Sequence, residues 1–201
     1  MHHQTRWTAQ RIGRYLDIIE PLVYRIRQPL PPFRLKILDG PNAQPLIDRD
    51  VDDGDWPIIK SNSYWAEWLT DFTLRTYLKI PTGWDVALPT ALHLPLGTSG
   101  DFSHPEGLVY LDGQPFAACD RNHQEILLGP DSCDSHPHLL AIHGWTGRQG
   151  WQSNDPGSRP LMGQCSLVQI DAATRDFIKT ARVALGAVSY THLTLPTILL
   201  V

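Results

Sequence analysis

The clearest pattern of apolar and polar positions lies between residues 71 and 80. Apolar or small side chains alternate there with polar ones, a period of two that is typical of a strand with one buried face. The first face holds Phe72, Leu74, Thr76, Leu78 and Ile80, and the second holds Thr73, Arg75, Tyr77 and Lys79. We therefore predict a half-buried strand over this segment.

Several further strands are expected downstream. Leu108–Leu111 and Phe116–Cys119 flank Asp112-Gly113, a dipeptide that favours a two-residue hairpin turn. A second alternating run has Val86, Leu88, Leu92, Leu94 and Leu96 on one face, and Pro89 and Pro95 place it at a sheet edge or in a bulged strand. Three more short strands are predicted over Glu125–Leu128, His138–His143 and Cys165–Ile170.

Helical spacing occurs only near the two ends. Ile12, Leu16, Ile19 and Val23 recur at intervals of three to four residues, with Thr5 or Thr8 as the cap and Pro21 kinking or ending the helix. Near the other end, Asp171 is placed to cap a helix that carries Phe177, Ala181, Ala184 and Leu185. The expected fold is mainly β: an antiparallel β-sandwich of the jelly-roll or galactose-binding-like type, with an N-terminal helix and a C-terminal exit helix.

These elements predict five segments. Residues 1–30 are an N-terminal helical segment, and 31–62 are a proline-rich and then acidic surface connection. Residues 63–170 form the sandwich, 171–187 the exit helix and 188–201 a tail.

Composition and charge exclude several classes of function. The 201 residues are 42% hydrophobic, and a net charge of -4 gives no basic patch for a nucleic acid or an anionic membrane. No apolar run reaches membrane-spanning length, and the three cysteines (Cys119, Cys133 and Cys165) contain no C-x-x-C pair. We expect a cytoplasmic protein without nucleic-acid or membrane partners.

Two segments resemble metal sites superficially. The acidic run Asp48–Asp55 imitates a calcium loop, but Asp53 stands where glycine is required and Ile59 where a carboxylate is required. The second is Cys133, His136, His138 and His143, which fits no zinc signature, and His138 and His143 would point to opposite faces of one strand. A solvated loop and an ordinary strand end are the preferred interpretations.

Other chemistry has weaker support. No G-x-S-x-G elbow is present, and carboxylate pairs for glycoside hydrolysis cannot be recognised from spacing. The available carboxylates are interpreted as turn residues: Asp101, Glu106, Asp112, Asp120 and Glu125. Seven tryptophans could line a sugar platform, with Trp65, Trp68, Trp84 and Trp145 as candidates, although core packing is their expected principal role.

Two adjacent segments carry a family resemblance. Glu106–Pro115, followed by Asp120–Leu128, resembles the strand, hairpin and strand in the N-terminal region of glycoside hydrolase family 38 α-mannosidases of the cytosolic and vacuolar type. Shorter matches lie in the same order, so the resemblance spans most of residues 5–187. They are Gly54-Asp55-Trp56, Phe72–Ile80, Pro81–Trp84, Thr174-Arg175-Asp176 and Val183-Ala184-Leu185. Ser103-His104-Pro105 departs from the compact glycine-rich turn of that family.

The resemblance implies a β-sandwich that packs against a catalytic α/β barrel. The enzymes it resembles are retaining, metal-dependent exo-glycosidases acting on α-mannosides, and the motif that opens their catalytic domain does not occur here. It therefore implies no catalytic, cofactor-binding or metal-binding residue in this chain. Zinc and the α-mannoside substrate would belong to the missing catalytic domain, which is the expected partner, and the parent enzyme could be a homo-oligomer.

The tail has a separate interpretation. Val188–Leu193 is similar to what one reading frame of a sequencing-library transposon end encodes, so we expect the biological sequence to diverge after about Ala187 and 188–201 to be non-native. Two other functions remain open: a stand-alone carbohydrate-binding sandwich module, and an esterase-like or metal-dependent hydrolase with an unrecognised site.

Overall fold

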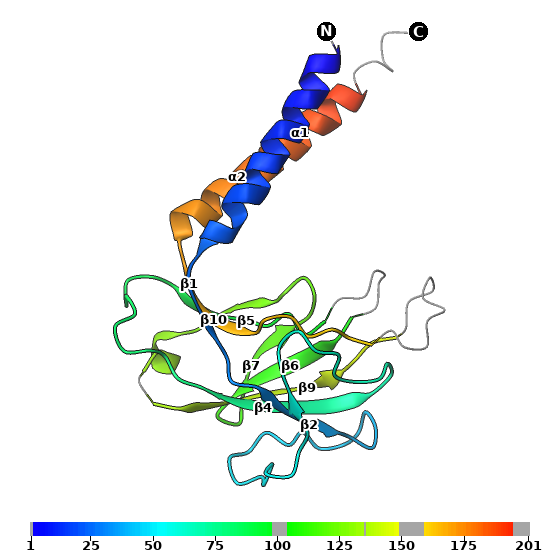
Figure 1. Cartoon of the computed structure of the whole chain (residues 1–201), viewed down its shortest axis with the longest axis vertical. Coiled ribbons are helices and arrows are strands. Elements are labelled where there is room, and N and C mark those ends of the chain that lie inside the picture. Colours follow the sequence, from blue (N-terminus) through cyan, green and yellow to red (C-terminus); the bar gives the residue numbers. More distant parts are fainter. Residues whose placement is uncertain (1, 98–103, 135, 149–158, 195–201) are drawn as a thin grey trace. The chain divides into compact units, whose positions relative to one another are not determined.

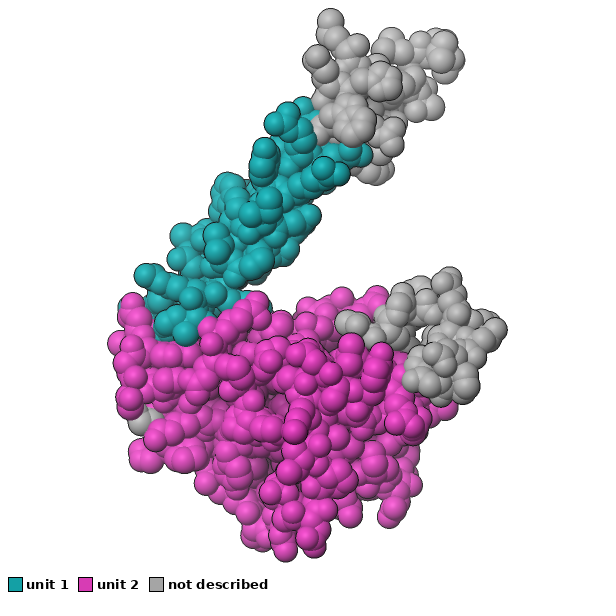
Figure 2. All heavy atoms as spheres, in the orientation of Figure 1, with its two compact units in different colours: residues 1–26, 87–89, 169–201 teal, residues 27–86, 90–168 magenta. Residues whose placement is uncertain are grey.

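The computed structural model describes residues 2–97, 104–134, 136–148 and 159–194, with side chains described between 8 and 188. The chain divides into two compact units (Figures 1 and 2). Unit 1 comprises residues 1–26, 87–89 and 169–201, and unit 2 comprises residues 27–86 and 90–168. Unit 2 contains most of the β-structure, and unit 1 contains both α-helices.

The β-structure forms two sheets (Figure 1). The four-stranded sheet has the order β1-β10-β5-β8, and the six-stranded sheet has the order β3-β2-β4-β9-β6-β7. The strands are β1 (Tyr24–Pro29), β2 (Phe33–Ile37), β3 (Ile58–Ile59), β4 (Asp71–Leu78), β5 (Thr90–His93), β6 (Glu106–Leu111), β7 (Gln114–Cys119), β8 (Glu125–Leu127), β9 (His138–Trp145) and β10 (Ser166–Ile170). The mainly β, antiparallel sandwich expected from the sequence is confirmed.

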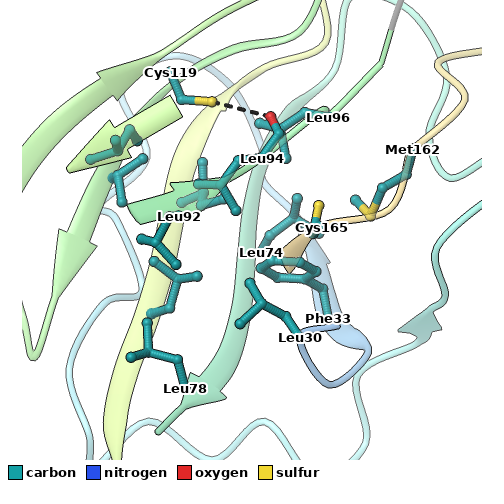
Figure 3. Packing of buried hydrophobic residues seen from close by; sticks show 14 of the residues in the cluster. Leu30, Phe33, Leu74, Leu78, Leu92, Leu94, Leu96, Cys119, Met162 and Cys165 are labelled. Atoms are coloured by element: carbon teal, nitrogen blue, oxygen red, sulfur yellow. Dashed lines mark hydrogen bonds between the residues drawn. The ribbon is translucent and has the colours of Figure 1, made fainter. Parts of the chain in front are cut away.

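The core of unit 2 is formed by side chains from both sheets (Figure 3). Phe72, Leu74 and Ile142 of the six-stranded sheet are 0% exposed, as is Leu92 of the four-stranded sheet. Leu94 and Met162 close the same cluster from the connections between strands. Burial of this apolar surface is the main force that holds the two sheets together.

The strand predicted most directly, β4, is buried on both faces over most of its length. Phe72, Leu74 and Leu78 face the core as expected, but Thr73 and Arg75 on the opposite face are also almost fully buried. Tyr77 and Lys79 keep the exposure that a half-buried strand predicts. The prediction is wrong at Thr73 and Arg75, and the segment around residues 46–56 covers Arg75 on the second face.

The hairpin predicted at Asp112-Gly113 connects β6 to β7 by a two-residue turn. Leu111 pairs with Gln114, and Asp112 and Gly113 have φ values of 51° and 78°. Two successive positive φ values define the primed turn that Asp-Gly favours. On its other side β6 pairs with β9, where Gly107 lies opposite Gly144. A Cβ on Gly144 would lie 2.0 Å from the carbonyl oxygen of Glu106, so this approach of two backbones requires glycine.

Unit 1 contains two helices, α1 (His2–Ile19) and α2 (Ala172–Thr194), together with a 3₁₀ turn, η1 (Glu20–Val23). Helix α1 begins before Thr5 and Thr8, so neither threonine is its cap. It ends at Ile19 and gives way to η1 at Glu20, one residue before Pro21, which agrees with the predicted end. The predicted cap of α2 is confirmed, since Asp171 Oδ1 accepts from the Thr174 N–H at 2.8 Å. Helix α2 continues past Ala187 as far as Thr194.

Two further predictions are wrong. Residues 31–62 contain β2 and β3 and are therefore part of the sandwich. The prediction missed β2 because its alternation, with Phe33, Leu35 and Ile37 against Arg34 and Lys36, covers only five residues. Strand β5 is not an edge strand. Its two flanking prolines lie just outside Thr90–His93, so β5 can pair on both sides, with β10 and β8.

Candidate functional site

The acidic run Asp48–Asp55 is organised around a buried guanidinium group. Arg75 extends from β4 with its side chain 1% exposed, and its Nε donates to Asp53 Oδ2 at 2.8 Å. Its Nη1 donates to the carbonyl oxygens of Leu46 and Asp48, at 3.0 and 2.7 Å. The ring of Trp56 lies 5.7 Å from the guanidinium carbon. The loop therefore surrounds the positively charged guanidinium group of Arg75.

This arrangement agrees with the rejection of a calcium loop and corrects the preferred interpretation of a solvated loop. A calcium loop directs its oxygens at an ion, whereas here Arg75 takes one carboxylate and two carbonyls. The loop is also not simply solvated, because Arg34 Nη1 donates to the carbonyls of Asp53 and Gly54 at 2.9 and 2.8 Å. Sequence reasoning missed Arg75 as the organiser; an arginine on the second face of a strand, following an acidic run, was the available signal.

A second polar cluster centres on His138 at the start of β9. Its Nδ1 lies 2.6 Å from Asp112 Oδ2, and its Nε2 lies 2.9 Å from Asp134 Oδ1. Asp112 Oδ1 also accepts from Arg49 Nη2 at 2.6 Å and from the Leu139 N–H at 2.8 Å. Because both ring nitrogens face carboxylate oxygens, the doubly protonated imidazolium satisfies this geometry best.

The pKa values of this cluster move accordingly. Burial disfavours the charged ring, but hydrogen bonds to Asp112 and Asp134 outweigh it and raise the pKa of His138 above 6.5. Burial raises the pKa of Asp112, but the hydrogen bonds from His138, the Leu139 N–H and Arg49 outweigh burial, so the pKa of Asp112 is lowered. The pKa of Asp134 falls to about 2, chiefly because the His136 N–H donates to it and then because His138 does.

The four residues of the candidate zinc cluster do not converge. His138 lies between two carboxylates, exposed His136 bonds Asp134, and His143 lies on the opposite face of β9, as its odd spacing predicted. Among the described residues, no group of three or more His, Cys, Asp or Glu side chains is arranged to hold a metal ion. Sequence reasoning missed Arg49 and Asp134, which come from loops and carry no local signature.

The cysteines are free thiols. Cys119 and Cys165 are buried in the core, and burial raises the pKa of each to about 12. Burial also raises the pKa of Cys133, which is partly exposed. The thiolate needed for nucleophilic chemistry is therefore disfavoured at all three positions.

The remaining carboxylate candidates lie apart in the fold. Asp120 holds the turn after β7 by accepting from the backbone N–H groups of Asn122 and His123, and Glu125 lies opposite His93 between β8 and β5. Glu106 begins β6 and lies 3.5 Å from His104 Nε2. Asp101 falls outside the described residues. Asp112 and Asp134 both bind His138, which lies between them, so the two carboxylates do not face a common open space.

The four candidate tryptophans separate into two groups. Trp65 is 6% exposed, donates its Nε1 proton to the Leu96 carbonyl at 2.8 Å and packs edge-on against Phe72, so it is a core residue. Trp84 also packs against the core. Trp68 and Trp145 are partly exposed, and Trp145 ends β9 opposite Asp71 of β4 and Glu106 of β6.

Neither helix, over the residues that the structure describes, is long and apolar enough to span a bilayer.

No protein-family model matches the chain, and no curated protein matches it in sequence. Solved structures similar to it include a β-glucuronidase from Faecalibacterium prausnitzii, at 11% identity and a TM-score of 0.48 over 73% of this chain. A β-glucuronidase of Bacteroides uniformis (17% identity, TM-score 0.46) and a calcium-binding mutant of the B. uniformis β-glucuronidase 2 (16%, 0.49) each match over 72%. The matches cover 32%, 18% and 18% of those chains, so this chain spans only part of each and is assigned to no family by them.

Proposed function

We propose that this chain is the non-catalytic N-terminal β-sandwich region of a family 38 α-mannosidase of the cytosolic and vacuolar type. The observation that carries the proposal is the segment 106–128, whose residues resemble that family. It forms β6, β7 and β8 of the sandwich, with Asp112-Gly113 at the hairpin turn. In this proposal the sandwich stabilises or positions a catalytic barrel, and α2 leads towards it.

The ionisation of the acidic and thiol side chains supports a structural role. A general acid in glycoside hydrolysis needs a carboxyl pKa raised towards neutrality, but the pKa values of Asp112 and Asp134 are lowered by the groups they bind. A nucleophilic cysteine needs a lowered pKa, but those of Cys119 and Cys165 are raised. These shifts favour side chains that hold loops and core together.

The proposal places the remaining functions of the parent enzyme in its catalytic domain. That domain would hold the zinc ion and hydrolyse terminal α-mannosides, and it would be the main partner of this sandwich. The whole enzyme would act in the cytoplasm, without nucleic-acid or membrane partners, and could assemble with further copies of itself.

Recovery of the source transcript tests this parentage. We expect its sequence to diverge from the present one near codon 188 and to continue into a domain with the zinc ligands and nucleophilic aspartate of the family. An uninterrupted match through codon 201, with a different domain beyond it, would overturn the assignment.

A second candidate function is a carbohydrate-binding module. The position of Trp145, partly exposed between Asp71 and Glu106, favours it. The two functions are compatible, because an accessory domain of a glycosidase can also bind sugar.

A further inference from the structure

The outer face of the six-stranded sheet carries an unusual pair of rungs, defined here as residues directly opposite one another on β4, β9 and β6. The first rung is Asp71, Trp145 and Glu106, and the second is Thr73, His143 and Leu108. Directly paired residues of neighbouring strands point to the same side of a sheet. Trp145 therefore has a carboxylate on each side and a hydroxyl and an imidazole two residues away.

Two polar atoms of the second rung are buried without a hydrogen-bond partner. They are Oγ1 of Thr73, a residue that is 0% exposed, and Nδ1 of His143. Buried polar atoms in folded proteins are nearly always paired, so an unpaired one needs an explanation. Thr73 is closed to solvent, so a molecule on this face would meet the partly exposed His143 ring and not the Thr73 hydroxyl.

The face is open on its β6 side. Leu108 is 51% exposed and the side chain of Glu106 is 54% exposed, whereas the next rung, through Arg75, is covered by the loop 46–56. With the ordinary spacings of a sheet, the area formed by three strands and two rungs measures about 10 Å across the strands and about 7 Å along them. The exposed area thus forms a ledge beside that loop.

We propose that this ledge, formed by Asp71, Glu106, His143 and Trp145, binds a neutral sugar. The indole face would pack against the apolar C–H face of a pyranose ring, and the two carboxylates would accept hydrogen bonds from its hydroxyl groups. The partly exposed His143 ring would contact a further hydroxyl. The choice of α-mannosides as first ligands rests on the proposed function; the ledge itself does not.

The charges of the ledge set the ligand class. Asp71 and Glu106 flank the ring. Lys36 of β2 lies opposite Thr73 on the same face, Arg34 and Arg75 lie one rung further from Trp145, and His104 lies beside Glu106. A sugar carboxylate would be repelled by the pair of acids, so uronic acids should bind worse than neutral sugars. The alternative ligand is a simple cation, which would bind Asp71 and Glu106 through charge alone and would need no hydroxyl groups.

Calorimetric titration of the full chain tests the site, with α-linked mannobiose, cellobiose, glucuronic acid and glucosamine as probes. Trp145→Ala, Asp71→Asn and Glu106→Gln are the variants. Tyr64→Ala, which removes an aromatic ring that is 62% exposed elsewhere, is the matched control. Thermal unfolding of each variant shows that the fold is kept.

We expect mannobiose to bind the native chain and Tyr64→Ala equally, and Trp145→Ala to lose at least about tenfold in affinity. The two carboxamide variants should each lose affinity as well. Binding of cellobiose in place of mannobiose, with the same dependence on Trp145, would support the ledge and contradict the α-mannoside parentage. Absence of neutral-sugar binding, affinity unchanged in Trp145→Ala, or a preference for glucuronic acid or glucosamine would overturn the ledge.

Discussion

Arg75 and Asp53 form a salt bridge at 2.8 Å that joins β4 to the acidic loop, with the arginine side chain 1% exposed and the aspartate 21% exposed. Replacement of Arg75 by Met would leave the Leu46 and Asp48 carbonyls and the Asp53 carboxylate without their donor. We expect the free energy of unfolding to fall by about 2–4 kcal/mol, measured by urea denaturation. Asp55→Asn, an exposed change in the same loop, should have little effect; equal losses in both variants would contradict the role of Arg75.

Calcium should leave the stability of the chain unchanged. Arg75 occupies the Asp53 carboxylate and the Asp48 carbonyl, and the described acidic side chains of residues 48–55 form no group of three arranged to hold a metal ion, so we expect no prepared Ca²⁺ site there. Thermal unfolding with excess calcium and then with a chelator measures this. An increase in melting temperature that depends on calcium and disappears in Asp53→Asn would contradict it.

The contrast between β4 and this loop shows what the sequence could predict. The period of two in residues 71–80 placed the strand correctly, because alternation reports which face meets a core. It could not show that Arg75 is buried, because the groups that cover it lie 22 to 29 residues away along the chain. The same limit concealed Arg49 and Asp134 around His138, whereas the Asp112-Gly113 turn depended only on its own two residues and was predicted correctly.

Stability should decrease as the pH rises through the pKa of His138. That pKa is raised in the folded state, so the stabilisation from His138 is fully present below the unfolded value of about 6.5 and is lost above the folded one. Urea denaturation at about pH 6 and about pH 9 measures the decrease. In His138→Gln, which does not titrate, the difference between the two pH values should shrink; an unchanged difference would show that other groups cause it.

Substitution at the paired glycines of β6 and β9 should disrupt the sheet. In Gly144→Ala the new methyl group would lie 2.0 Å from the Glu106 carbonyl and 2.6 Å from the Cα of Gly107, so the strands must separate. We expect a loss of about 3 kcal/mol or more, visible as a lower melting temperature. Gly129→Ala is the control, because nothing lies within 4 Å of its added Cβ and its φ of -75° suits alanine. Similar melting temperatures for the two variants would mean that β6 and β9 do not approach so closely.

The central claim is that this sandwich belongs to an α-mannosidase but does not itself carry the chemistry. Its most direct test is an assay with zinc and chromogenic α-mannoside and β-glucuronide substrates, on the 201-residue chain and on the longer protein encoded by the recovered transcript. The account predicts that the longer protein hydrolyses the α-mannoside only, and that the 201-residue chain shows no turnover above a heat-inactivated control. Turnover by the 201-residue chain, or a longer protein inactive on α-mannosides, would contradict it.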